Sequence, residues 1–381
     1  MLFRLLKLAF TKRGRSGVAP VAKPRTPRPI APSAAPPAQQ PQIPDPAAAR
    51  GEQALSQSAD WQFRPPPGDL QKEAELRALL DHCFSRMRYE LQPATRQIVE
   101  ASAARFLPPA APSDLHVFVY HVDVGGVTAK YRDISIDTSV FDYHAVLRAF
   151  LDSVRRWHAH ANVWLVTNPG SPFTTLAAER VQVVELDALP GRTMYERVRA
   201  MCAYVHSPSF TADTLFLDSD AFLNGPTAPW LCGEFDIAVT YRNRLWMMPV
   251  NEGVMAAKIA RPDAVRAFFR RYLATYDQLV DDERVQAFYG DVRRWRGGQL
   301  SLNAVTRGGY PYSAFRELDL SGAVLKALPT ESFNYSYEYG EKLDPRELDA
   351  RAVVHLKGGR KTSLDAWLAY AAARSREACA A

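Results

Sequence analysis

The chain has 381 residues, of which 47% are hydrophobic, enough to build a substantial core in one large domain or two modest ones. Its formal charge of +6 comes entirely from residues 1–60, where nine Lys or Arg face three Asp or Glu, so the other 321 residues are formally neutral. This composition excludes a chain that is disordered throughout, and it gives no support to nucleic-acid binding by the folded part.

Three further features bear on the cellular compartment. The four cysteines are far apart and form no CxxC pair, so the sequence indicates neither a zinc site nor a disulfide framework. No stretch approaches the roughly 18 to 20 uninterrupted apolar residues of a membrane-spanning helix. Arg4 and Lys7 interrupt the apolar first residues too early for a signal-peptide core, and no small-residue cleavage site follows. We therefore expect a cytoplasmic location.

The first part of the chain divides into three segments. Residues 1–17 are basic and amphipathic, which suits either peripheral attachment to the inner face of an anionic membrane or a frayed tail. Residues 18–67 hold 13 of the 28 prolines together with Ala, Gln and Ser, and this composition predicts a disordered linker. Apolar residues recur at helical spacing in residues 68–110, which predicts a helical lead-in divided at Pro93.

From residue 111 to residue 375, strand patterns alternate with helix patterns, which predicts an α/β domain with a mostly parallel central sheet and helices on both faces. The expected strands are 115–120, 162–167, 181–186, 214–218, 235–241, 254–257 and 352–355. The expected helices are 143–157, 193–205, 262–279, one that begins near 299, and 363–372. A turn is expected at 251–253, between two of the strands.

An acidic pair follows the apolar run 215–217, which has the pattern of a strand buried on both faces. Asp218 and Asp220, separated by Ser219, fall at the carboxyl end of that strand, where ligands bind in open α/β sheets. Two carboxylates this close repel each other unless a cation shares them, and Mg²⁺ or Mn²⁺ prefers such oxygen ligands. The pattern predicts a divalent-metal site for a diphosphate.

Two other interpretations of the acidic pair stay open at this point. In a haloacid-dehalogenase-like phosphohydrolase, Asp218 would be the nucleophile and Asp220 the acid/base. Phe222 stands where those enzymes usually carry Thr or Val, and no clear later metal-binding acid pair is present. In a purely structural role, one of the two acids would cap the following helix or turn.

Five segments occur in an order that resembles the nucleotide-diphospho-sugar transferases of the GT-A fold, most closely glycosyltransferase family 8 and its relatives. They are Arg-Ala-Met-Cys-Ala-Tyr-Val (199–205), Thr-Leu-Phe-Leu-Asp-Ser-Asp-Ala-Phe-Leu-Asn (214–224), Asn-Glu-Gly-Val-Met (251–255), Gly-Gln-Leu-Ser-Leu-Asn (298–303) and His-Leu-Lys-Gly-Gly-Arg-Lys (355–361). The similarity spans roughly residues 114–370, so it leaves out the N-terminal segments.

The resemblance implies a role for each residue that matches a family motif. Asp218 and Asp220 match the Asp-x-Asp pair, in which the second acid binds Mn²⁺ (or Mg²⁺) and the first reaches the metal and the ribose. His355 matches the third protein ligand of the metal, and Gly358 and Lys361 match residues that approach the diphosphate. A neutral imidazole beside two carboxylates is a reasonable donor set for Mn²⁺.

Other matches are less direct. Glu252 stands where the family has Ser in an Asn-Ser-Gly turn, and Gly298 stands where the family has the Asp of an Asp-Gln pair. If that Asp contacts the sugar in relatives, Gln299 or Glu252 must make the contact in this chain. Tyr120, at the end of the first strand, either stacks on a uracil or packs in the core. Arg197 and Arg199, on the helix before the acidic pair, either reach the sugar or phosphate or lie on a solvated helix face.

The resemblance thus implies a metal-dependent glycosyltransferase of the hexosyltransferase type (EC 2.4). It would transfer a sugar from a nucleoside-diphosphate sugar, expected to be a UDP-sugar, to an acceptor hydroxyl. The acceptor class stays open among glycan, lipid-linked and protein acceptors. The basic N-terminal segment is consistent with envelope or polysaccharide glycan synthesis, and equally with a tether alone.

Overall fold

The computed structural model describes most of the chain from residue 90 onward. The described residues are 74, 78, 82, 90–122, 128–131, 134–137, 141–188, 192–241, 250–289, 297–306, 322–338 and 340–380. The predicted basic segment 1–17 and linker 18–67 lie outside them, as does nearly all of the lead-in before residue 90. Among the described residues, no helix combines the length and the apolarity that crossing a membrane requires.

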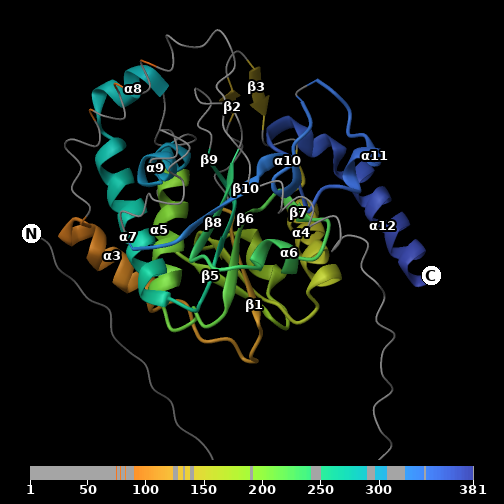
Figure 1. The fold of residues 1–381 in the computed structure, drawn as a ribbon, viewed down its shortest axis with the longest axis horizontal. Helices are drawn as coiled ribbons and strands as arrows, with labels where there is room; N and C mark the ends of the chain where they lie inside the picture. The colour runs from red at the N-terminus through yellow and green to blue at the C-terminus, as the bar shows by residue number, and fades with distance from the viewer. Residues whose placement is uncertain are drawn as a thin grey trace, which may run out of the picture. The chain divides into compact units, whose positions relative to one another are not determined.

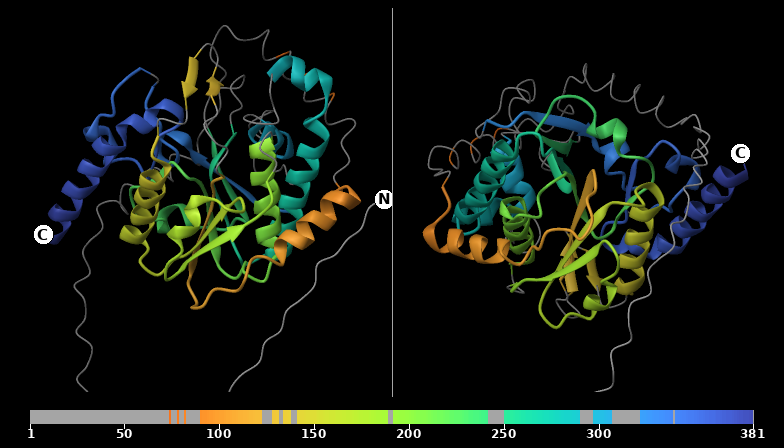
Figure 2. Two further views of the ribbon diagram at one scale, coloured as in Figure 1. Left: turned by 180° about the vertical axis from the view of Figure 1, so that it is seen from behind. Right: turned by 90° about the horizontal axis from the view of Figure 1, so that it is seen from below.

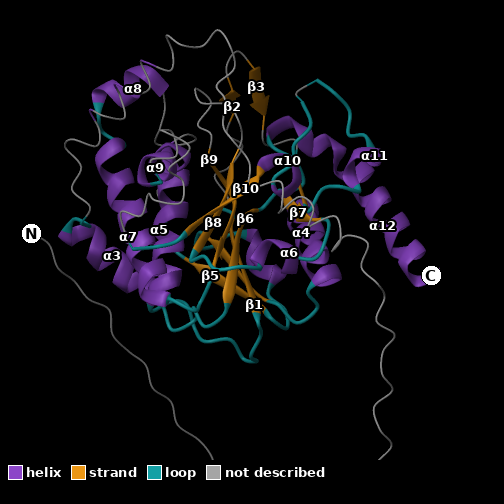
Figure 3. Ribbon diagram, viewed as in Figure 1, coloured by secondary structure: helices purple, strands orange, loops and turns teal. Residues whose placement is uncertain are grey.

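A seven-stranded sheet lies at the centre of the described part, in the order β10-β8-β9-β6-β1-β4-β5 (Figures 1 and 3). Its strands are β1 (Leu115–Tyr120), β4 (Asn162–Thr167), β5 (Val181–Glu185), β6 (Asp213–Asp218), β8 (Ile237–Tyr241), β9 (Val250–Ala257) and β10 (Leu325–Pro329). Within this sheet only β9 runs antiparallel to its neighbours, β6 and β8. The predicted mostly parallel sheet is confirmed.

Helices cover both faces of the sheet, as predicted, and Figure 2 shows the two groups from below. One group comprises α3 (Pro93–Ala103), α5 (Thr193–His206), α7 (Pro262–Leu279) and α9 (Gly297–Val305), with α8 (Glu283–Tyr289) following α7. The other comprises α4 (Tyr143–Trp157), α6 (Ala228–Leu231), α10 (Thr330–Phe333), α11 (Pro345–Leu348) and α12 (Leu364–Ala380). Two short 3₁₀ segments, η2 (Pro172–Leu176) and η7 (Gly358–Ser363), complete the described helical elements.

The strands separate two hydrophobic cores because successive side chains point to opposite faces. In β1, Phe118 belongs to the core beneath α5, whereas Val117 and Val119 belong to the core beneath α4. Tyr204 of α5 packs on Phe118, with ring centroids 5.3 Å apart, and on Trp164, at 5.2 Å. All six residues of β1 are buried, which explains why this strand is apolar in sequence apart from His116.

The structure corrects a predicted turn and a predicted helix end, and it adds a strand. Residues 251–253 do not form a turn between two strands, because β9 is a single strand with an irregular register opposite Val239 and Thr240. Such a bulge leaves extra residues on one strand and redirects their side chains, which short-range patterns do not reveal. Strand β10 was not predicted, and α12 continues to Ala380 rather than ending at residue 372.

Two small antiparallel sheets add to the central one. Strands β2 (Thr128–Tyr131) and β3 (Ile134–Asp137) pair with each other after β1. Strand β7 (Ala221–Leu223) begins directly after the acidic segment and pairs with β11 (Val353–His355). In that second pair His355 lies opposite Ala221, so the late segment of the chain returns to the carboxyl end of β6.

Candidate functional site

Strand pairing brings the two halves of the predicted site together. Asp218 is the last residue of β6, and Asp220 precedes β7. The backbone N–H of Leu356 donates to the carbonyl oxygen of Asp220 at 2.9 Å, which extends the β7–β11 ladder to the acidic segment. His355 is therefore fixed beside the carboxylates by backbone hydrogen bonds as well as by its own side chain.

The side chains of Asp218, Asp220 and His355 converge on one point. His355 Nε2 lies 2.8 Å from Asp220 Oδ1 and 3.5 Å from Asp218 Oδ2. One potential ligand atom from each residue falls within 4.8 Å of the others. Asp220 and His355 are buried and Asp218 is partly exposed, so the cluster opens on the side of Asp218.

Each of the three side chains is also held through the atom that does not face this point. These outer contacts join Asp218 Oδ1 to Arg197 Nη2 at 2.9 Å, Asp220 Oδ2 to Lys361 Nζ, and His355 Nδ1 to Asn334 Oδ1 at 2.7 Å. Outer partners of this kind fix the orientation of metal-binding side chains. Two carboxylate oxygens and one imidazole nitrogen, so oriented, fit a divalent cation such as Mn²⁺.

The protonation states of these groups agree with that fit. Burial alone would raise the pKa of Asp220, but the positive charge of Lys361 and the hydrogen bond to His355 hold it well below its ordinary value. Burial lowers the pKa of His355, although Asp220 opposes the effect. At neutral pH Asp220 is therefore ionised, the form that binds metals.

Arg197 joins the acidic cluster to a second buried carboxylate. Its Nη1 lies 3.2 Å from Glu252 Oε2, and its Nη2 donates to the Glu252 carbonyl oxygen at 2.9 Å as well as to Asp218. The Tyr272 hydroxyl donates to the same Oε2 at 2.8 Å. Burial raises the pKa of Glu252 to about 7, against the opposing charge of Arg197. Glu252 is thus a buried acid poised near neutrality.

Two glycines allow this close packing. A Cβ atom on Gly253 would lie 2.6 Å from His355 Cε1 and 2.7 Å from Asp218 Oδ2. A Cβ atom on Gly298 would lie 2.2 Å from Glu252 Oε2. The Glu252 carboxylate therefore fills the space that a side chain at position 298 would need. The Glu at position 252 and the Gly at position 298, which both differ from the motifs that the sequence resembles, thus fit together in space.

The structure places the remaining predicted residues as follows. Gln299 Oε1 accepts from Asn251 Nδ2 at 3.1 Å, next to Glu252. Ser219 Oγ contacts His121 Nδ1 at 2.9 Å. Gly358 opens η7 with a left-handed φ of 55°, which suits glycine and lets the chain turn toward Lys361.

Tyr120 lies opposite Asp218 in the β1–β6 pairing, and Arg199 lies on α5. Tyr120 is 7% exposed and belongs to the hydrophobic core beneath α5. Arg199 pairs with Glu196 at 2.5 Å and donates to the carbonyl oxygen of Asp187, in the segment that follows β5. Arg197, two residues earlier on α5, is the arginine that contacts Asp218.

Sequence reasoning missed two residues of this region. His121 follows β1 directly and packs against Tyr143 and Phe173, with ring centroids 4.7 and 4.8 Å away. A polar residue just after a buried strand, at the carboxyl edge where Asp218 also lies, was a usable signal. Asn334 ends the short helix α10 and matches no motif, so no sequence signal pointed to it.

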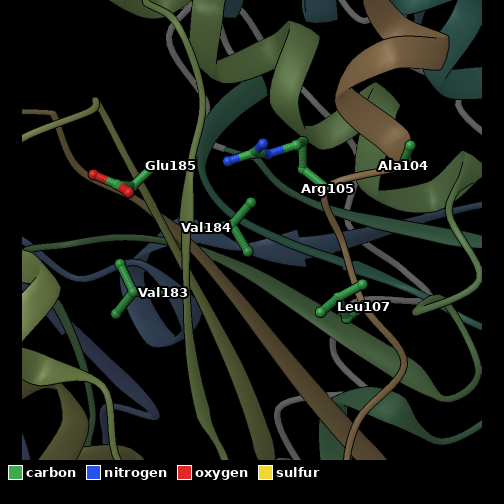
Figure 4. Close-up of a pocket in the computed structure, with 6 residues that line it drawn as sticks. All are labelled: Ala104, Arg105, Leu107, Val183, Val184 and Glu185. Carbon is green, nitrogen blue, oxygen red and sulfur yellow. The ribbon is translucent and has the colours of Figure 1, made fainter. Parts of the chain in front are cut away.

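A surface pocket of about 300 Å³ lies elsewhere, beside the edge strand β5 (Figure 4). It is lined by Val183, Val184 and Glu185 of β5 and by Ala104, Arg105 and Leu107, which follow α3. None of the predicted site residues lines it. Its mixed lining lacks the convergent polar groups of the Asp218 cluster, so we assign the site to that cluster.

Glu252→Gln is expected to change how stability depends on pH. The pKa of Glu252 rises from 4.5 to about 7 on folding, so the folded protein binds this proton more tightly than the unfolded chain does. The free energy of unfolding should therefore fall as pH rises from 4.5 to 7, by roughly 3 kcal/mol from this group. Glu252→Gln should flatten that decline in urea unfolding at pH 5, 6 and 7.5. If the free energy of unfolding fell equally with pH in the variant and the wild type, Glu252 would not have a raised pKa.

No protein-family model matches the chain, and no curated protein is similar to it at a significant level. Solved structures with a similar fold include galactosyltransferase LgtC in complex with donor and acceptor sugar analogues, at 13% identity and a TM-score of 0.38, over 64% of this chain and 87% of that one. Another is glycosyltransferase GlyE of Streptococcus pneumoniae, at 12% identity and a TM-score of 0.38, over 67% of this chain and 59% of that one. A third is mouse xyloside xylosyltransferase 1, at 13% identity and a TM-score of 0.36, over 64% of this chain and 98% of that one. This chain is similar to those glycosyltransferases in fold.

Proposed function

We propose that the protein is a divalent-metal-dependent glycosyltransferase of the GT-A type. It transfers a sugar from a nucleoside-diphosphate sugar, with UDP as the expected nucleotide, to an acceptor hydroxyl. The observation that carries this proposal is the convergence of Asp218, Asp220 and His355, each held by an outer partner, with the Lys361 ammonium beside them. Membership of glycosyltransferase family 8, the Mn²⁺ preference and the hexosyl donor belong to the same proposal.

The chain's own residues divide the work of such a transfer. Asp218, Asp220 and His355 would hold the cation, which when bound supplies Lewis-acid stabilisation of the diphosphate leaving group. Lys361, already in contact with Asp220, places a second positive charge at the same edge of the sheet. Glu252 is connected to Asp218 through Arg197, and Gln299 bonds to the neighbouring Asn251; these two side chains would contact the sugar.

The geometry argues against the phosphohydrolase alternative. In that chemistry Asp220 would have to carry a proton and give it to the leaving group. Lys361 and His355 hold the pKa of Asp220 well below its ordinary value, so it stays ionised at any working pH. Asp218, the supposed nucleophile, has one oxygen paired with the buried Arg197 and the other turned toward His355.

Nucleoside-diphosphate release from a panel of UDP-, GDP- and ADP-sugars should test the proposal. The full chain is expected to turn over at least one donor with Mn²⁺ and to lose that turnover in excess chelator. Isothermal titration should show Mn²⁺ binding to wild type. His355→Ala should remove both the Mn²⁺ binding and the metal-dependent turnover. Release of phosphate from simple phosphomonoesters, with no turnover of any sugar nucleotide, would favour the phosphohydrolase instead.

Peripheral membrane attachment and a lipid-linked acceptor stay predictions from residues 1–17, which lie outside the described part of the chain.

A further inference from the structure

A chain of side-chain hydrogen bonds runs from the proposed metal ligand His355 to the predicted sugar-contacting residue Gln299. His355 Nδ1 lies 2.7 Å from Asn334 Oδ1, and Asn334 Nδ2 donates to Asn251 Oδ1 at 2.7 Å. Asn251 Nδ2 in turn donates to Gln299 Oε1 at 3.1 Å. The two parts of the candidate site, which come from β11 and α9, are therefore connected through two asparagines.

A backbone amide sets the direction of every bond in this chain. The N–H of Gly253 donates to Asn251 Oδ1 at 2.9 Å, and a backbone N–H can only donate, so this atom of Asn251 must be the oxygen. The Asn334 atom that faces it must then be the amide nitrogen. The other end of the Asn334 amide is its oxygen, so the His355 nitrogen that meets it must carry the proton. Nε2, which lies 2.8 Å from Asp220 Oδ1 and 3.5 Å from Asp218 Oδ2, is then the ring nitrogen left to face the metal.

Asn334 has no freedom to turn. It is 0% exposed, and its second amide hydrogen goes to Thr240 Oγ1 at 3.0 Å. Thr240 Oγ1 donates its own proton to the Asn251 carbonyl oxygen at 3.1 Å, so it is an acceptor toward Asn334. Both donors and the acceptor of Asn334 are thus satisfied, and rotating the amide would place like groups against each other.

We infer that Asn334 is a positioning residue for the metal site. It accepts the Nδ1 proton of His355, which leaves Nε2 as the ring nitrogen that faces the oxygens of Asp218 and Asp220, and it ties this ring orientation to Asn251 and Gln299. The inference rests on the proposed function for its consequence in catalysis. The hydrogen bond from His355 Nδ1 to Asn334 is a property of the metal-free protein and can be observed separately.

Histidine ring ¹⁵N shifts in the metal-free protein provide the first test. The chain has eight histidines, and loss of one set of signals in His355→Gln identifies those of His355. Wild type should show a ring N–H signal at Nδ1 that exchanges slowly with water, because this proton is bonded to the buried Asn334 amide. Asn334→Ala should lose that slow exchange. Mn²⁺ affinity, followed by the spin resonance of the free ion, should fall about 10- to 100-fold in Asn334→Ala.

Asn224→Ala is the matched control. Asn224 is another buried asparagine, at the end of β7, and its Nδ2 donates to the carbonyl oxygens of Leu348 and Arg351 without contacting the ligand cluster. It should lose stability but keep the slowly exchanging Nδ1 proton of His355 and the Mn²⁺ affinity. An unchanged Nδ1 signal and unchanged affinity in Asn334→Ala would overturn the inference. Absence of Mn²⁺ binding to wild type would overturn the proposed function, while the Nδ1 signal would still decide the role of Asn334.

Discussion

Asp220→Asn is expected to weaken Mn²⁺ binding by more than about 100-fold, which exceeds what the loss of an outer partner costs, and to abolish metal-dependent turnover. The substitution removes one carboxylate from the point where Asp218 and His355 also converge. It also leaves the Lys361 ammonium, which is largely buried, without its counter-charge. Breaking a buried pair from one side costs about 3–5 kcal/mol, so the variant should also be less stable. Isothermal titration with Mn²⁺ and urea unfolding measure the two effects.

A double variant separates these effects. Asp220→Asn combined with Lys361→Met removes both charges and should recover most of the lost stability, because an apolar replacement of a buried pair is often close to neutral. Metal binding should stay lost. Asp349→Asn is the matched control, since the Asp349–Arg374 pair, at 2.8 Å, is partly exposed and should contribute no more than about 1 kcal/mol. Normal Mn²⁺ affinity in the double variant would show that Asp220 is not a ligand.

Gly298→Ala is expected to destabilise the protein by about 1–3 kcal/mol, as overpacking of a well-packed interior does. In an exposed helix the same change would be favourable by about 1 kcal/mol. Here the new methyl group would lie 2.2 Å from Glu252 Oε2, and the Glu252 carboxylate cannot move aside because Arg197 and Tyr272 hold it. The sign of the effect therefore depends on Glu252.

Repeating Gly298→Ala in a Glu252→Ala background tests that dependence. Once the carboxylate is absent, the substitution should become neutral or stabilise by about 0.5–1 kcal/mol, the usual gain of alanine over glycine in a helix. Urea unfolding of the four proteins gives the coupling energy directly. Gly225→Ala is a suitable control, because its Cβ would meet only Ala352 Cα at 3.9 Å, an ordinary contact. Equal effects in both backgrounds would show that Glu252 does not fill the space beside Gly298.

The sequence by itself determined the α/β architecture and the position of the acidic pair. Strands buried on both faces appear as continuous apolar runs, so β1, β4 and β6 were visible, and α7 was visible through the period of its apolar residues. A pair of acids at the end of such a strand is a local pattern, and Asp218 and Asp220 could be found from it. The late segment with His355 was found from a family resemblance, since no local rule connects it to β6.

Only the tertiary structure decided which polar groups surround those acids. The choice of Arg197 over Arg199 follows from the direction in which α5 presents each side chain, and the bulge in β9 brings Glu252 to Arg197. Asn334 reaches His355 because the loop that carries it packs against β11. Pairings between distant segments depend on packing that short-range sequence patterns do not encode, which is why the acids could be predicted and their partners could not.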